Sequence, residues 1–167
     1  QLIYPDNETL LKIVAHDLVD LISFTGGTKT AKILSAHSGI KKTLFELGGN
    51  DALVVMPDAD IEKVVSTIIV QRFKCAGQRC TAPKRIFLHK DIKKNVCELL
   101  ISKAQNLKIG DPLKVNTEIG PVISQQAKDH ILDKLNASLN LGAKSLLTWK
   151  AEGNIISPVI LDNVSIS

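Results

Sequence analysis

The sequence predicts an α/β fold with a largely parallel sheet. Short apolar segments of strand length alternate along the chain with longer segments whose apolar residues recur at helical spacing. Glycine pairs stand at two of the joints, Gly26-Gly27 and Gly48-Gly49, where predicted strands end. The chain has 167 residues, 44% of them hydrophobic, which is enough for one modest domain with a core or for two incomplete ones.

The first third of the chain shows both patterns in turn. A helix is predicted over residues 7–16, where Asn7 can cap the N-terminus, and a strand is predicted over 18–25. The Gly26-Gly27 turn then leads into a helix over 28–36. Two short apolar runs flank Gly48-Gly49 and are predicted as strands at 44–45 and 52–56.

The remaining two thirds continue the alternation. Three helices are predicted here from apolar residues at helical spacing that follow polar or acidic residues: 58–72, 91–106 and 124–141. Gly142 ends the last of these helices. Apolar runs of strand length are found at 85–89, 144–149 and 155–161. Pro158 makes the last of these an edge strand, because proline has no N–H to give to a neighbouring strand.

Composition argues against several classes of partner. The net charge of +4 comes from 21 basic and 17 acidic residues that are spread along the chain, and aromatic residues are few, so we expect no nucleic-acid partner. There is no run of 18 apolar residues and no signal-peptide pattern at the start, so no membrane partner is expected. Cys75, Cys80 and Cys97 are too few for a disulfide scaffold and indicate a reducing, cytoplasmic location. The histidines lack metal-ligand spacing, and we predict no metal site.

Two glycine-containing segments are candidates for chemistry. Phe24-Thr25-Gly26-Gly27-Thr28 joins a strand to a helix, where backbone N–H groups can hold a phosphate; the alternative is an ordinary tight turn. In Glu46-Leu47-Gly48-Gly49-Asn50 a carboxylate ends a strand. Partial burial of Glu46 would raise its pKa and suit it to act as a general base; the alternative is a structural residue before a turn.

A third segment, Gly77-Gln78-Arg79-Cys80-Thr81, lies between a predicted helix and a predicted strand. The positive neighbour Arg79 and nearby N–H groups would stabilise a thiolate, which makes Cys80 a candidate nucleophile. The alternative is that Cys80 is a small buried hydrophobic residue, as free cysteines often are. Cys97 lies inside a predicted helix, and we assign it to the core.

Taken together and in this order, these segments resemble the aldehyde dehydrogenase superfamily. Phe24-Thr25-Gly26 is similar to that family's Phe-Thr-Gly-Ser segment, and Glu46-Leu47-Gly48-Gly49-Asn50 to its Glu-Leu-Gly-Gly-Lys/Asn signature. Gly77-Gln78-Arg79-Cys80 is similar to its Gly-Gln-x-Cys signature, and Asp58-Ala59-Asp60 matches a further stretch between the two. The resemblance covers almost the whole chain.

The resemblance implies a fold and a reaction. Residues 1–47 would be the end of a Rossmann-like NAD(P)-binding domain, and residues 48–167 the first part of the catalytic α/β domain, both incomplete. The implied reaction is NAD- or NADP-dependent oxidation of an aldehyde to a carboxylic acid, through a thiohemiacetal and a thioester on Cys80.

It also implies roles for individual residues. Glu46 would activate the water that hydrolyses the thioester, and the Cys80 N–H would donate to the oxyanion. Gly26 and Gly27 would lie near the cofactor pyrophosphate. Leu47 and Gly48 would contact the nicotinamide amide through their backbone.

Arg79 relates the chain to a subgroup. Gly-Gln-Arg-Cys, with the residues that follow it, most resembles non-phosphorylating glyceraldehyde-3-phosphate dehydrogenases. The resemblance implies that Arg79 would face the anionic tail of a small aldehyde, such as a phosphate group. Aminoadipate-semialdehyde and lactaldehyde dehydrogenases are the alternatives. Gly27 departs from the family pattern because it stands where the family usually has serine.

The chain also lacks segments that the family carries. The strands that bind adenosine and ribose, a Pro-Trp-Asn segment that completes the oxyanion hole, a Glu-Glu-x-Phe-Gly-Pro segment and the oligomerisation region are absent from the sequence. We therefore expect both ends to be cut, the isolated chain to be inactive and the full-length enzyme to be a homo-oligomer. The alternative function is a non-catalytic fragment or interaction module derived from an aldehyde dehydrogenase.

Overall fold

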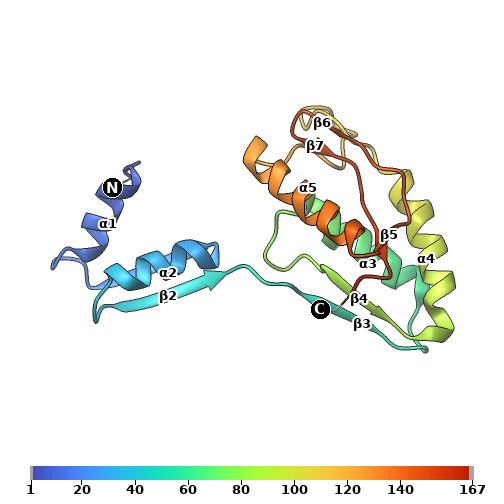
Figure 1. Ribbon diagram of the computed structural model, residues 1–167, viewed down its shortest axis with the longest axis horizontal. Coiled ribbons are helices and arrows are strands. Elements are labelled where there is room, and N and C mark those ends of the chain that lie inside the picture. The colour runs from blue at the N-terminus through green and yellow to red at the C-terminus, as the bar shows by residue number, and fades with distance from the viewer. Residues whose placement is uncertain (1, 166–167) are drawn as a thin grey trace. The chain divides into compact units, whose positions relative to one another are not determined.

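The computed structural model describes residues 2–165 and divides into two compact units, Gln1–Gly49 and Asn50–Ser167 (Figure 1). Helices and strands alternate through both units, which confirms the predicted α/β class. The assignment of residues 1–47 to a cofactor domain and of 48–167 to a catalytic domain stays a prediction. Each unit is described by itself below.

The first unit is a pair of parallel strands with two helices. Its elements are α1 (Asn7–Ala15), β1 (Leu21–Gly26), α2 (Thr28–His37) and β2 (Lys42–Leu47). The strands pair in register from Leu21 opposite Lys42 to Gly26 opposite Leu47. Buried Val14, Ile22 and Leu34, one from each of α1, β1 and α2, form the core of this unit, and the rings of Phe24 and Phe45 pack edge to face beside it.

Two boundaries in the first unit differ from the sequence prediction. Asp6, not Asn7, caps α1, because the Asp6 carboxylate accepts a hydrogen bond of 2.7 Å from the Thr9 N–H. The strand predicted from residue 18 begins only at Leu21, because the His16 ring accepts a hydrogen bond from the Leu18 N–H and the chain turns at this point.

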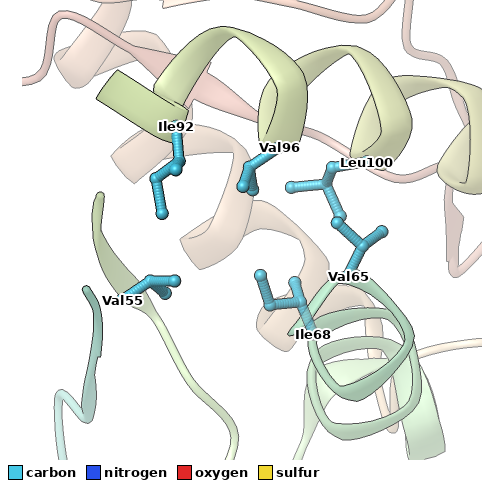
Figure 2. Close-up of a cluster of buried hydrophobic side chains, with 6 residues drawn as sticks. All are labelled: Val55, Val65, Ile68, Ile92, Val96 and Leu100. Atoms are coloured by element: carbon cyan, nitrogen blue, oxygen red, sulfur yellow. The ribbon is translucent and has the colours of Figure 1, made fainter. Parts of the chain in front are cut away.

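The second unit is built around another parallel strand pair, β3 (Ala52–Val55) and β4 (Arg85–Leu88). Its helices are α3 (Ile61–Phe73), the short η1 (Lys74–Gly77), α4 (Lys90–Gln105) and α5 (Gln125–Asn140). Figure 2 shows the core: Val55 from β3 points toward side chains from α3 and α4, which are Val65, Ile68, Ile92, Val96 and Leu100. As predicted, Ser124 caps α5 by accepting a hydrogen bond from the Ala127 N–H.

The last part of the chain departs from the parallel pattern. The strands predicted at 144–149 and 155–161 are replaced by two-residue strands: β5 (Lys144–Ser145) pairs antiparallel with β8 (Leu161–Asp162), and β6 (Ala151–Glu152) with β7 (Ile155–Ile156). Pro158 separates β7 from β8, since it cannot donate to a sheet. Within residues 2–165, no helix has the length and apolar character needed to cross a membrane.

Candidate active-site segments

The carboxyl ends of β1 and β2 bring together several of the predicted site residues. The register places Thr25 opposite Glu46 and Gly26 opposite Leu47. Gly27 and Gly48 directly follow these strands. Ligands of open parallel sheets bind at the carboxyl edge of the strands, so these residues occupy a suitable position for a cofactor.

The two glycines of the first turn have different steric reasons for being small. A Cβ atom at Gly26 would overlap the ring of Phe24, whereas a Cβ at Gly27 would meet nothing within 4 Å. Gly27 is the N-cap of α2, and no side chain caps the first-turn N–H groups of this helix, which also carries no acidic residue there. The first turn of α2 therefore has free donors and open space, as a phosphate requires.

Glu46 lies on the face of β2 that points away from the core of the first unit. Its neighbours Phe45 and Leu47 are half-buried, while Glu46 is exposed. Among residues 2–165 its carboxylate has no hydrogen-bond or ion-pair partner. The partial burial considered from the sequence is therefore absent, and the carboxylate is open to water.

The loop that leads to Cys80 has an unusual backbone. Cys75, Ala76 and Gly77 all adopt left-handed conformations, with φ of 54°, 53° and 75°. For the two non-glycine residues this costs about 1–2 kcal/mol each. Gly77 has a second constraint, because a side chain there would overlap the guanidinium of Arg72. Such strained backbone is found preferentially at functional sites.

Gln78 holds this strained loop in place. Its backbone N–H and its side-chain Nε2 both donate to the carbonyl of Cys75, at 3.1 and 3.0 Å, and its Oε1 accepts from the backbone N–H of Ile123 at 2.8 Å. The Gln78 side chain thus fastens the approach to Cys80 onto the segment before α5. Gln78 belongs to the Gly-Gln-Arg-Cys motif, but this clamping role requires the fold, because its partner Ile123 is distant in the sequence.

Arg79 and Cys80 directly follow Gln78 in the chain. Cys80 is exposed. The Arg79 guanidinium donates to the side-chain oxygens of Gln71, at 3.0 Å, and Thr81, at 3.5 Å, and within residues 2–165 no carboxylate pairs with it. Its positive charge is therefore not compensated by a carboxylate, and it belongs to the residue that precedes exposed Cys80 in the chain, which suits an anionic substrate.

The other two cysteines provide a comparison. Cys97 is half-buried in α4, and burial raises the pKa of its thiol, which makes it a poor nucleophile. Cys75 is exposed like Cys80, so exposure alone does not distinguish these two. Within the described part of the chain, no group of three or more His, Cys, Asp or Glu residues is arranged to hold a metal ion.

The structure thus presents two sets of predicted site residues. Glu46, Leu47, Gly48 and the Gly26-Gly27 turn belong to the first unit, and Arg79 and Cys80 to the second. Two further residues of the second unit are connected to this segment, although they were not among the predicted site residues: Lys84 donates to the carbonyl of Cys80, and Asp51 accepts from Lys84.

Known proteins share both the sequence and the fold of this chain. The aldehyde dehydrogenase family model matches residues 1–167. A sulfoacetaldehyde dehydrogenase of Neptuniibacter caesariensis is 45% identical over 165 residues, covering 99% of this chain and 36% of that protein. An NADP-dependent glyceraldehyde-3-phosphate dehydrogenase of Streptococcus equinus is 35% identical over 153 residues, covering 92% of this chain and 32% of that protein.

A solved structure gives the same result. The crystal structure of the NADP-dependent glyceraldehyde-3-phosphate dehydrogenase of Bacillus halodurans C-125, complexed with NADP, superposes with a TM-score of 0.93 at 31% identity, covering 99% of this chain and 35% of that one. The chain therefore spans about a third of the length of these relatives. Since the family model matches from the first residue to the last and the four matching segments stand in their family order, the chain belongs to the aldehyde dehydrogenase family.

Proposed function

We propose that the native polypeptide carrying this chain oxidises an aldehyde to a carboxylic acid, with NADP or NAD as the hydride acceptor. Its substrate is glyceraldehyde 3-phosphate or a related small aldehyde with a phosphate or sulfonate tail. The observation that supports this most is that exposed Cys80 directly follows Arg79 in the chain, and that the charge of Arg79 has no carboxylate partner in the described residues. The names of two relatives, which specify sulfonated and phosphorylated aldehydes, support the same substrate class.

The chemistry divides between Cys80 and Glu46. The Cys80 thiolate adds to the aldehyde carbonyl, and the backbone N–H of Cys80 donates to the oxyanion that forms. A bound nicotinamide would supply the hydride acceptor, so that loss of hydride from the former carbonyl carbon leaves a thioester on Cys80. Glu46 takes a proton from a water molecule, which attacks the thioester carbonyl. The carbon–sulfur bond then breaks, and the carboxylic acid and the Cys80 thiolate are released.

The first unit supplies the cofactor contacts in this proposal. The uncapped first turn of α2, with Gly26 and Gly27, would hold the pyrophosphate, and the backbone of Leu47 and Gly48 would hold the nicotinamide amide. The free N–H donors and the open space at Gly27 fit such a group. Relatives described as NADP-dependent support NADP, and NAD is the alternative.

Gly27→Ser tests this cofactor site. The open space at Gly27 accommodates the hydroxymethyl group, whose hydroxyl can cap α2 or bind phosphate. We expect a gain in stability of only a few tenths of a kcal/mol, and a rise in NADP affinity of about twofold to tenfold from one added hydrogen bond. Calorimetric titration with NADP and thermal unfolding measure the two effects separately. A higher Tm with unchanged NADP affinity would place the pyrophosphate elsewhere.

Arg79→Gln tests the proposed substrate class. Removing one charged hydrogen-bond donor is expected to raise the KM for sulfoacetaldehyde or glyceraldehyde 3-phosphate by about tenfold to a hundredfold. The KM for an uncharged aldehyde such as propanal should stay within about twofold, because no such contact is lost. Steady-state formation of NADPH by the native polypeptide measures both.

Lys94→Gln is the matched control for this experiment, since it removes one positive charge from the exposed surface of α4. It should leave all KM values unchanged. An equal rise in KM for charged and uncharged aldehydes in Arg79→Gln would contradict a role of Arg79 in recognising the anionic tail.

The non-catalytic alternative makes different predictions. Mass spectrometry of the intact native polypeptide, combined with calorimetric titration of NADP, distinguishes the two proposals. A mass of 18.1 kDa without NADP binding would favour the alternative, whereas a larger polypeptide that binds NADP and oxidises an aldehyde would exclude it.

A further inference from the structure

Lys84 binds the loop of the proposed nucleophile. Its ammonium donates to the carboxylate of Asp51 at 2.8 Å, to the carbonyl of Cys80 at 3.1 Å and to the carbonyl of Ala82 at 2.9 Å. An ammonium group has three N–H donors, so all of them are used here. The Lys84 side chain is 29% exposed and the Asp51 side chain 43%, so the pair is partly shielded from water.

The backbone around Asp51 explains why Lys84 is held firmly. The Asp51 carbonyl accepts from the backbone N–H groups of Lys84, at 2.9 Å, and Arg85, at 3.0 Å. The Arg85 guanidinium donates twice to the carbonyl of Asn50, at 3.0 and 2.7 Å. The strand starts at Asn50–Asp51 and Lys84–Arg85 are thus tied together, and the Lys84 side chain extends this tie back to Cys80.

The Asp51 carboxylate carries its negative charge at neutral pH and so attracts the Lys84 ammonium. The hydrogen bond from Lys84 lowers the pKa of the Asp51 carboxyl, which therefore stays ionised well below pH 7. An ionised Asp51 keeps the ammonium directed at the loop. Protonation of Asp51 in acid would weaken this contact.

We propose that Lys84 is a positioning residue for the reaction at Cys80. Gln78 fastens the loop before Cys80, and Lys84 fastens it after Cys80 by fixing the carbonyls of Cys80 and Ala82. Together they set the backbone angles of Cys80 and so the directions of its thiol and its N–H. This inference rests on the proposed function, in which both groups of Cys80 act on the aldehyde.

Lys84→Met tests the proposal, because methionine has a similar length and no charge. Misplacement of a catalytic group by about 1 Å can cost about a hundredfold in rate. We expect kcat for aldehyde oxidation by the native polypeptide to fall by about tenfold to a hundredfold, with KM within about twofold. Hydrogen exchange should become at least about tenfold faster over residues 78–84 and stay unchanged in α4.

A second readout separates positioning from loss of the thiol. Alkylation of Cys80 by iodoacetamide needs the thiolate but forms no oxyanion, so its rate should change less than about threefold in Lys84→Met. Exposed Cys75 in the same chain is the internal reference for this reagent. Lys84→Arg keeps a charged donor and should recover part of the lost kcat, whereas a merely space-filling role would not need the charge.

Two further variants complete the design. Lys128→Met is the matched control, because Lys128 also donates to a backbone carbonyl, that of Gly153, elsewhere in the same unit. This variant should change neither kcat nor the rate of hydrogen exchange over residues 78–84. Asp51→Asn should lower kcat less than Lys84→Met does. Adding Asp51→Asn to Lys84→Met should cost little more, because the two residues act through one contact.

The outcomes separate failure of this proposal from failure of the proposed function. If Lys84→Met leaves hydrogen exchange over residues 78–84 unchanged, or makes it faster while kcat stays unchanged, Lys84 is not a positioning residue. If alkylation of Cys80 in the unmodified protein leaves aldehyde oxidation intact, then Cys80 is not the nucleophile and the proposed function fails. If the unmodified protein oxidises no aldehyde, the catalytic role of Lys84 falls with the proposed function, and the exchange data still decide whether Lys84 fixes the loop.

Discussion

Cys80→Ser is expected to lower the kcat for aldehyde oxidation by about 10⁴-fold or more, the scale seen when a catalytic nucleophile is removed. A serine hydroxyl ionises far above the pH at which a cysteine thiol does, so it needs a base in contact with it to attack a carbonyl. Within residues 2–165 no His, Asp or Glu side chain forms a hydrogen bond with the Cys80 side chain. The substitution therefore leaves a nucleophile of nearly the same size that cannot be activated.

Cys75→Ser is the matched control, since it is the same change at another exposed cysteine of the same loop. Its turnover should stay within about threefold of the unmodified protein, because serine and cysteine have similar volumes. Formation of NADPH and mass spectrometry of a thioester trapped on the Cys80 peptide measure the result. Substantial turnover in Cys80→Ser, or its loss in Cys75→Ser alone, would move the nucleophile away from Cys80.

Local patterns predicted most of the fold. The sequence predicts the helices α3 and α4 from their apolar spacing, and it predicts Ser124 as the cap of α5, because helical faces and N-caps depend on residues that are close in the chain. The choice between Asp6 and Asn7 as the cap of α1 was not predictable, since both residue types cap helices and only the geometry decides. The apolar run at 155–161 was predicted as one strand, but Pro158 divides it between β7 and β8.

The motif residues of the candidate site were predictable, whereas the contacts that hold them were not. Lys84 and Asp51 are 33 positions apart, and Gln78 and Ile123 are 45 apart, so no local pattern links them. The register of β3 and β4, with Ala52 opposite Arg85, places Asp51 beside Lys84, and this register requires the fold. The left-handed backbone at Cys75 and Ala76 carries no sequence signal, because neither residue is a glycine.

Glu46→Gln is expected to separate the two halves of the reaction. The amide has the shape of the carboxylate but cannot take a proton from water, so only hydrolysis of the thioester should slow. The first turnover should still release NADPH, giving a burst of about one equivalent per active site. Steady-state turnover should then fall by about 10²-fold to 10⁴-fold, the usual contribution of a general base. Stopped-flow absorbance of NADPH follows both phases.

The position of Glu46 favours this outcome. It is exposed at the end of β2 and has no partner within residues 2–165, so the substitution breaks no contact of the first unit. Glu8→Gln is the control, since within residues 2–165 the Glu8 carboxylate pairs only with Lys12, on the surface of α1; the substitution should change neither phase. Unchanged steady-state turnover in Glu46→Gln would remove Glu46 from hydrolysis. Loss of the burst would instead assign it to the addition of the thiol or to the transfer of hydride, because both precede hydrolysis of the thioester.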